Sequence, residues 1–251
     1  MKLSSVAKTD VGRRREHNED AFLIDDALGL YAVADGMGGH AAGEVASNEA
    51  LETLRDHILQ HEVLIADFVR SPDNDLAEQV RRTAEQSVRL AAYQVFGLTE
   101  LEPERKGMGT TLSMLMILPQ AAFVAHVGDS RIYMLRDGKT AMLTSDHTFV
   151  AAMVAKGKMT AEQARRSKYS NVLMRAVGSK DYVEVETRLV RYRPEDVFLL
   201  CSDGMHGYFK PGELEQLVDC DDLGASLDKL VQLALDRGGK DNITGVMVRV
   251  D

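Results

Sequence analysis

The chain has 251 residues, of which 45% are hydrophobic and 27% charged, and this balance is typical of a globular protein with ample core. Its formal net charge of −9 disfavours nucleic acid binding, because contacts with phosphates need a basic surface. No apolar run reaches the roughly 20 residues that cross a bilayer, and the N-terminus lacks the apolar core of a signal peptide. We therefore expect a cytoplasmic protein with no membrane insertion.

The N-terminal half is predicted to contain three strands followed by two helices. The strands are short apolar runs bounded by turn residues, at 2–8, 21–24 and 30–35. The last two runs flank an Asp-Asp…Gly turn, and this arrangement predicts a β-hairpin. Apolar residues at three- and four-residue steps predict helices over 41–69 and 75–95.

The C-terminal half is predicted to be mostly β-structure with short helices. Four runs separated by turns predict an antiparallel meander, at 110–118, 121–127, 131–135 and 140–143. Three further strands are expected at 183–190, 197–201 and 243–250. Helices are expected at 148–155, 160–168, 211–218 and 223–237. Because strands come first and last with helices inserted, the order favours an α+β sandwich with helices on the outside over a βαβ repeat.

Aspartates stand at the ends or starts of several predicted strands. They are Asp20, Asp35, Asp129, Asp203 and Asp241. Strand ends and starts can share one edge of an antiparallel sandwich, so these acids are expected to converge. Converging carboxylates repel one another unless cations neutralise them, and an all-oxygen set prefers Mg²⁺ or Mn²⁺ to zinc. An isolated Asp-Gly pair is also an ordinary turn signal, so it is the number of aspartates at strand ends that indicates a cation site.

Two other features leave alternatives open. The cluster Arg13-Arg14-Arg15 is either a solvated turn or the source of an arginine that binds a phosphate through two parallel hydrogen bonds. Cys201 and Cys220 are far apart and form no CxxC motif, which favours reduced thiols without a metal.

Six ordered motifs resemble those of bacterial metal-dependent protein serine/threonine phosphatases, the PPM or type 2C family. They span the chain from Asp10 to Val250 and are Arg15-x-x-Asn18-Glu19-Asp20, Asp35-Gly36-Met37-Gly38-Gly39-His40-x-x-Gly43-Glu44, Gly107-Met108-Gly109-Thr110-Thr111, Val127-Gly128-Asp129-Ser130-Arg131, Cys201-Ser202-Asp203-Gly204 and Asp241-Asn242-Ile243-Thr244. The resemblance implies two packed antiparallel β-sheets flanked by helices on both sides, with metals at one end. It also implies a single catalytic domain over 1–251, with residues 147–179 as the family's mobile flap.

The resemblance implies a set of metal ligands. Asp35 would bridge two ions of Mn²⁺ or Mg²⁺, and the carbonyl of Gly36 would bind the second ion. Asp203 and Asp241 would bind the first ion, and Asp20 would act mainly through metal-bound water. In bacterial members a third, weaker ion would lie between Asp203 and Asp129.

The resemblance also implies a mechanism. A hydroxide that bridges two ions would attack phosphorus in line with the leaving serine or threonine oxygen, with no phosphoenzyme. Arg15 would contact the substrate phosphate, and Thr110 and Ser130 would support the metal site. Met37 stands where many eukaryotic relatives have a histidine, so His40 becomes the nearest candidate proton donor. A helix-entry role for His40, with a metal-bound water as donor, is the alternative.

The expected function is therefore hydrolysis of phosphoserine and phosphothreonine on phosphorylated proteins, opposing a bacterial Ser/Thr kinase. We expect a monomer. One alternative is a pseudophosphatase that uses the same fold as a binding or regulatory module, although the intact acids Asp35, Asp203 and Asp241 argue against it. Another is a sigma-regulator-type phosphatase, which would use the same site.

Overall fold

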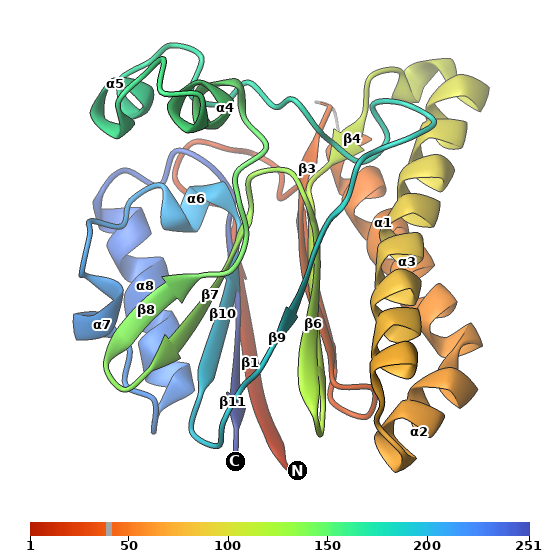
Figure 1. Cartoon of the computed structure of the whole chain (residues 1–251). Coiled ribbons are helices and arrows are strands. Elements are labelled where there is room, and N and C mark those ends of the chain that lie inside the picture. The colour runs from red at the N-terminus through yellow and green to blue at the C-terminus, as the bar shows by residue number, and fades with distance from the viewer. Residues whose placement is uncertain (39–41) are drawn as a thin grey trace.

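Two antiparallel sheets pack face to face, and helices cover the outer side of each (Figure 1). The computed structural model describes residues 1–38 and 42–251. One sheet has the order β1-β11-β10-β7-β8, with the bounds Leu3–Asp10, Ile243–Val250, Val197–Cys201, Arg131–Arg136 and Lys139–Met142. The other has the order β2-β3-β5-β6-β9, with the bounds Asp20–Asp25, Leu30–Met37, Leu112–Leu118, Ala121–Val127 and Glu186–Val190. A short strand, β4 (Gly109–Thr110), pairs with β3.

The space between the sheets is filled by apolar side chains from both. Tyr31 and Leu115 from one sheet pack with Phe198, Leu200 and Val246 from the other, and all five are buried. Strands β5 and β6 are buried along their whole length, because one face meets the other sheet and the opposite face meets helices. This explains why these strands are continuous apolar runs rather than alternating ones.

Helices α1 (Ala42–Gln60), α2 (Glu62–Arg70) and α3 (Asn74–Leu101) cover the β2-β3-β5-β6-β9 sheet (Figure 1). The predicted helix over 41–69 is two helices, which meet at His61. Helix α3 runs six residues beyond the predicted end at 95. On the other sheet lie α6 (Asp203–His206), α7 (Leu214–Leu217) and α8 (Leu223–Asp236), of which the sequence patterns did not predict α6. No helix in the described ranges is long and apolar enough to span a membrane.

The predicted four-stranded meander is wrong in one respect that matters for the site. Strands β5 and β6 belong to one sheet, whereas β7 and β8 belong to the other. The turn at Gly128 and Asp129 therefore crosses from sheet to sheet instead of closing a hairpin. Gly128 makes this crossing possible, because its φ is +116° and an added Cβ would lie 2.5 Å from the Thr111 side chain.

The predicted flap region carries two short helices, α4 (Phe149–Ala155) and α5 (Ala161–Arg165), above one end of the sandwich (Figure 1). Thr148 caps α4 through its side chain, and Thr160 forms a capping box with Gln163 at α5. The helix predicted over 160–168 thus ends earlier, as does the one predicted over 211–218.

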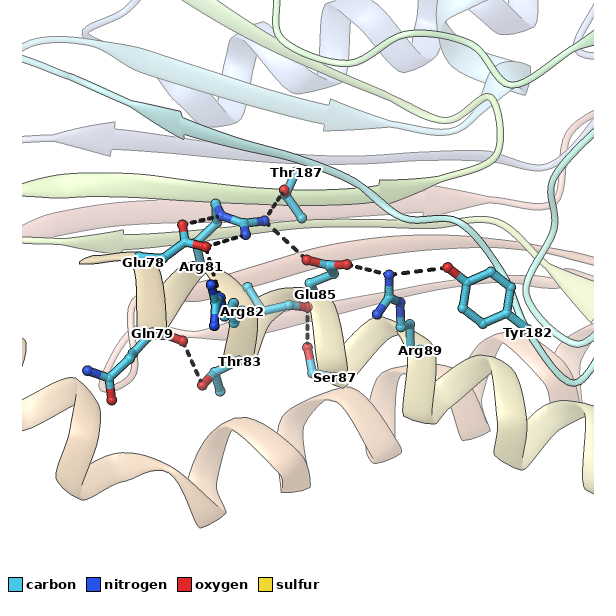
Figure 2. Close-up of polar contacts among 11 residues, drawn as sticks. Glu78, Gln79, Arg81, Arg82, Thr83, Glu85, Ser87, Arg89, Tyr182 and Thr187 are labelled. Carbon is cyan, nitrogen blue, oxygen red and sulfur yellow. Dashed lines mark hydrogen bonds and ion pairs between the residues drawn. The ribbon is translucent and has the colours of Figure 1, made fainter. Parts of the chain in front are cut away.

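Polar contacts hold the chain that leaves the flap region against α3. Figure 2 shows Arg81 donating to both carboxylate oxygens of Glu78 and to the hydroxyl of Thr187 on β9, at 2.6 Å. About two turns further along α3, Arg89 stacks 5.3 Å from the ring centre of Tyr182 and pairs with Glu85. These contacts tie the edge strand β9 and its approach to the helix layer.

Candidate metal centre

Asp20 and Asp35 are brought together by the hairpin that the sequence predicts. They are direct partners in the register of β2 and β3, so their side chains lie on the same side of the sheet. Asp35 lines a cavity at this end of the sandwich, of about 240 Å³. Asp20 is not among the described residues that line the cavity. It is buried behind it and accepts a hydrogen bond of 2.8 Å from Ser202 Oγ.

Asp203 follows one strand and Asp241 precedes its antiparallel neighbour, so both lie at the same edge of the sheet. Asp203 opens α6 directly after β10, and Asp241 precedes β11, which pairs with β10. Gly204 permits the close approach, because a Cβ there would lie 1.9 Å from the Asn242 carbonyl oxygen and 3.2 Å from the Asp241 Cβ. Both aspartates line the same cavity as Asp35.

Asp129 reaches the cavity from the sheet-crossing turn, and Thr111 connects that turn to Asp35. The Thr111 hydroxyl accepts a hydrogen bond from Asp35 N at 3.0 Å and lies 2.7 Å from Ser130 Oγ. Ser130, one of the two expected supports, thus contacts the residue that bonds the backbone of Asp35. Thr110, the other, donates to Thr111 O and pairs with Gly36 and Val177.

Asn242 is a residue of the site whose role the sequence did not reveal, although its position in the motif next to Asp241 could have drawn attention to it. Its side chain accepts from Glu19 N at 2.8 Å and donates to the carbonyls of Val11 and His17. These bonds hold the loop that carries Arg15 over the start of β11. Arg15 lines the cavity, and its Nη2 donates to Asp241 Oδ2 at 2.8 Å.

The aspartates are crowded enough to resist ionisation. Burial, followed by the charge of Asp20, raises the pKa of Asp35 well above its usual range. Burial raises the pKa of Asp20 and of Asp129 to about 7 in each case. Burial, followed by the charge of Asp241, also raises the pKa of Asp203. Full ionisation of the cluster thus calls for positive charge beyond what the cavity supplies.

The donor set fits hard divalent cations. Of the described residues that line the cavity, only Arg15 is basic, whereas Glu19 adds a further carboxylate to those of Asp35, Asp129, Asp203 and Asp241. Carboxylate oxygens with room for water are the ligands that Mg²⁺ and Mn²⁺ prefer. Gly36 is also required sterically, because a Cβ there would lie 2.2 Å from Gly43 O and 2.4 Å from Glu19 O.

One histidine was expected at the site, and another lies in the core near it. His40, the candidate proton donor, lies outside the described residues. His126 is a buried core residue whose ring nitrogens contact Ser113 Oγ at 2.8 Å and Ser145 O at 3.2 Å. The expected thiol state also agrees with the structure, in which Cys201 and Cys220 are both free.

The two-sheet sandwich flanked by helices is an architecture shared with solved bacterial phosphatases. The crystal structure of the Mycobacterium tuberculosis serine/threonine phosphatase PstP/Ppp superposes with a TM-score of 0.87 at 32% identity, covering 100% of both chains. A crystal structure of the catalytic domain of PstP in complex with two manganese ions gives a TM-score of 0.81 at 33% identity and covers 99% of both chains.

The sequence comparisons agree with this class. The serine/threonine phosphatase stp of Listeria monocytogenes is 34% identical over 248 residues, which cover 97% of this chain and 94% of that protein. The profile of the family described as "Protein phosphatase 2C" matches residues 11–247. The chain therefore belongs to the protein phosphatase 2C family, and the family and fold class expected from the motifs are confirmed.

Proposed function

We propose that this protein is a metal-dependent phosphoprotein phosphatase that hydrolyses phosphoserine and phosphothreonine. The observation that carries the proposal is the cavity, into which four distant segments bring Asp35, Asp129, Asp203 and Asp241 with one arginine beside them. Family membership and the manganese complex of PstP support the same conclusion. The intact carboxylates disfavour a pseudophosphatase, and a sigma-regulator-type phosphatase would use the same residues.

We propose Asp35, Gly36, Asp203 and Asp241 as ligands of two Mn²⁺ or Mg²⁺ ions, with Asp20 acting from behind the cavity. Asp129 and Asp203 are proposed to hold a third ion. When bound, the ions supply neutralising charge and an activated water for attack on phosphorus. The carboxylates would hold these ions at the cavity, and His40 remains the candidate donor of a proton to the leaving oxygen.

Arg15 is proposed to bind the substrate phosphate. Its guanidinium lies at the cavity, is about half exposed and is held by Asp241, so it can present two parallel N–H groups to phosphate oxygens. Arg15→Lys is expected to raise KM for a phosphothreonine peptide, because lysine keeps the charge and loses the planar pair of donors. We expect a loss in kcat/KM of about tenfold for Lys and more for Ala.

The neighbouring Arg14 is the matched control, because it is exposed and is not among the described cavity residues. Arg14→Lys should leave both kinetic constants within about twofold of the wild type. Equal effects of Arg14→Lys and Arg15→Lys would contradict a specific phosphate contact by Arg15.

The proposed function is tested by metal-dependent turnover. The purified chain, treated with EDTA and then supplied with Mn²⁺ or Mg²⁺, should hydrolyse p-nitrophenyl phosphate and release phosphate from phosphoserine and phosphothreonine peptides. Activity should be absent in EDTA and return with the ion. If the chain hydrolyses none of these substrates but still binds the phosphopeptides, the result would support the pseudophosphatase alternative instead.

We further propose that the protein acts as a cytoplasmic monomer on phosphorylated proteins, opposing a Ser/Thr kinase, without membrane insertion. Its free cysteines support a reducing compartment.

We propose that the whole chain, 1–251, is one catalytic domain and that residues 147–179 form a flap over the cavity. Asn171 and Leu173 support this role, because both line the cavity with the aspartates.

A further inference from the structure

His147 bonds to two segments that carry cavity-lining residues, although no motif pointed to it. The backbone N of His147 donates to Gly128 O and its carbonyl accepts from Met174 N, each at 2.7 Å. Gly128 N donates to His147 Nδ1 at 3.2 Å. Gly128 belongs to the turn that carries Asp129, and Met174 follows the cavity-lining residues of the flap. One residue thus bonds to the metal-ligand turn on one side and to the flap on the other.

The contacts of the two ring nitrogens orient the imidazole. A backbone N–H can only donate, so His147 Nδ1 accepts from Gly128 N. On the other side of the ring, Glu186 Oε2 lies 3.5 Å from Nε2 and Arg175 Nη1 lies 3.2 Å from it. Arg175 pairs with Glu184 through Nη2, which leaves Nη1 at the ring. Glu186 on β9 and Arg175 therefore hold Nε2, while Gly128 holds Nδ1.

The flap side of this linkage is a short stretch of paired backbone. Thr148 is bridged to Leu173, and Phe149 N donates to Val172 O at 2.8 Å. Asn171 and Leu173, on this stretch, line the cavity, whereas the exposed residues Val172 and Met174 are not among the described lining residues. Lining and non-lining residues alternate along this stretch, as they do along a strand. Because residues 147–149 pair with it, a displacement of His147 would move both lining residues.

The other side of the linkage is packed tightly. A Cβ on Gly128 would lie 2.5 Å from Thr111, whose hydroxyl bonds Asp35 N, so the turn rests directly on the residue that supports Asp35. A displaced turn therefore disturbs Asp129 and Asp35 together.

A metal site is the competing interpretation of this cluster. His126, His147 and Glu186 each offer a ligand atom within 4.8 Å of the others. Both nitrogens of His126 are already hydrogen-bonded, His147 Nδ1 is used by Gly128, and Arg175 occupies the space at Nε2. The cluster is therefore complete as a hydrogen-bonded linkage without an ion.

We propose that His147 is a positioning residue for phosphate ester hydrolysis, which holds the Gly128–Asp129 turn and the flap stretch 171–174 in a fixed relation around the cavity. The inference rests on the proposed phosphatase function. His147 acts through the positions of other residues, since its imidazole touches neither the cavity nor a metal-ligand side chain among the contacts described.

Two substitutions separate a hydrogen-bonding role from space filling. In His147→Asn the amide oxygen takes nearly the place of Nδ1 and can accept from Gly128 N, whereas the longer side chain of His147→Gln places its amide near Nε2. We expect His147→Gln to lower kcat/KM about tenfold and His147→Asn to stay within about threefold of the wild type. If the ring merely filled space, Gln would be tolerated better, because its volume is closer to that of His.

Two readouts do not depend on activity. Arg165, Arg166 and Lys168 are exposed trypsin sites in the flap. His147→Gln should be cleaved there several times faster than the wild type or His147→Asn, because its flap is less firmly attached to the turn. In calorimetric titration, His147→Gln should bind Mn²⁺ more weakly than the wild type, and His147→Asn should bind it as the wild type does. His57→Gln on α1 is the matched control and should change none of these measurements.

Glu186→Ala keeps the proposal testable if His147→Gln does not fold. Removing the carboxylate at Nε2 leaves the ring less firmly held, so flap cleavage should also accelerate in this variant. Flap cleavage and Mn²⁺ binding of His147→Gln equal to the wild type, or His147→Asn impaired as much as His147→Gln, would overturn the inference. An inactive wild type would instead refute the proposed function, while cleavage and ion binding would still decide the role of His147.

Discussion

Asp35→Asn is expected to abolish hydrolysis of p-nitrophenyl phosphate, with a loss in kcat of roughly 10³-fold or more, and to stabilise the metal-free protein. The activity is lost because the proposed bridging carboxylate loses its charge while its size is kept. Stability increases because burial and four neighbouring carboxylates raise the pKa of Asp35, so its ionised form is unfavourable in the fold. A protein that gains stability while losing activity cannot have lost activity through misfolding.

The pH dependence of this stabilisation has a definite sign. The pKa of Asp35 is higher in the folded than in the unfolded chain, so the folded state binds the proton more tightly. The free energy of unfolding of the metal-free wild type therefore falls as pH rises above about 3.9, the usual pKa of an unfolded aspartate. The advantage of Asp35→Asn should be largest near pH 8 and should vanish toward pH 4, as measured by thermal unfolding in EDTA.

Asp137→Asn provides a matched control for charge removal. Asp137 is exposed, and its φ of 51° is a conformation that asparagine adopts readily. Neither activity nor the pH dependence of unfolding should change in this variant. Activity of Asp35→Asn comparable to that of the wild type would refute the metal-bridging role, and a lower melting temperature of metal-free Asp35→Asn at pH 8 would contradict the account of mutual repulsion.

Gly204→Ala is expected to remove Mn²⁺ binding and activity through backbone displacement alone. The added Cβ would lie 1.9 Å from Asn242 O, a distance that no side-chain rotation relieves. Helix α6 must move away from the 241–242 segment, and Asp203 and Asp241 separate as a result. Overpacking of this kind costs about 1–3 kcal/mol or more of stability, so a lower melting temperature should accompany the loss of ion binding.

The control for this glycine is Gly97 in the interior of α3, where an added Cβ would have no neighbour within 4 Å. Gly97→Ala should raise the free energy of unfolding by about 1 kcal/mol and leave Mn²⁺ binding unchanged, because alanine favours the helix. Calorimetric titration and thermal unfolding measure both variants. Normal ion binding by Gly204→Ala would show that the approach of α6 to Asn242 is not needed for the site.

Local sequence patterns determined much of the fold and the identity of the site. Apolar runs between turn residues located most strands, and the hairpin of β2 and β3 followed from its turn. Acids at strand ends indicated a cation site. The ordered motifs then indicated the family, and they contain every acid that the structure places at or directly behind the cavity, including Glu19 beside Asp20.

Other features depend on which surfaces meet in three dimensions. The turns between the strands from β5 to β8 look alike in sequence, yet the one at Gly128 joins two sheets, because β6 is buried between α3 and the opposing sheet while β7 pairs with β10. That crossing places Asp129 at the cavity and lets His147 and Thr111 contact the turn. Such contacts join residues that are distant in the chain, so periodicity and spacing carry no signal for them.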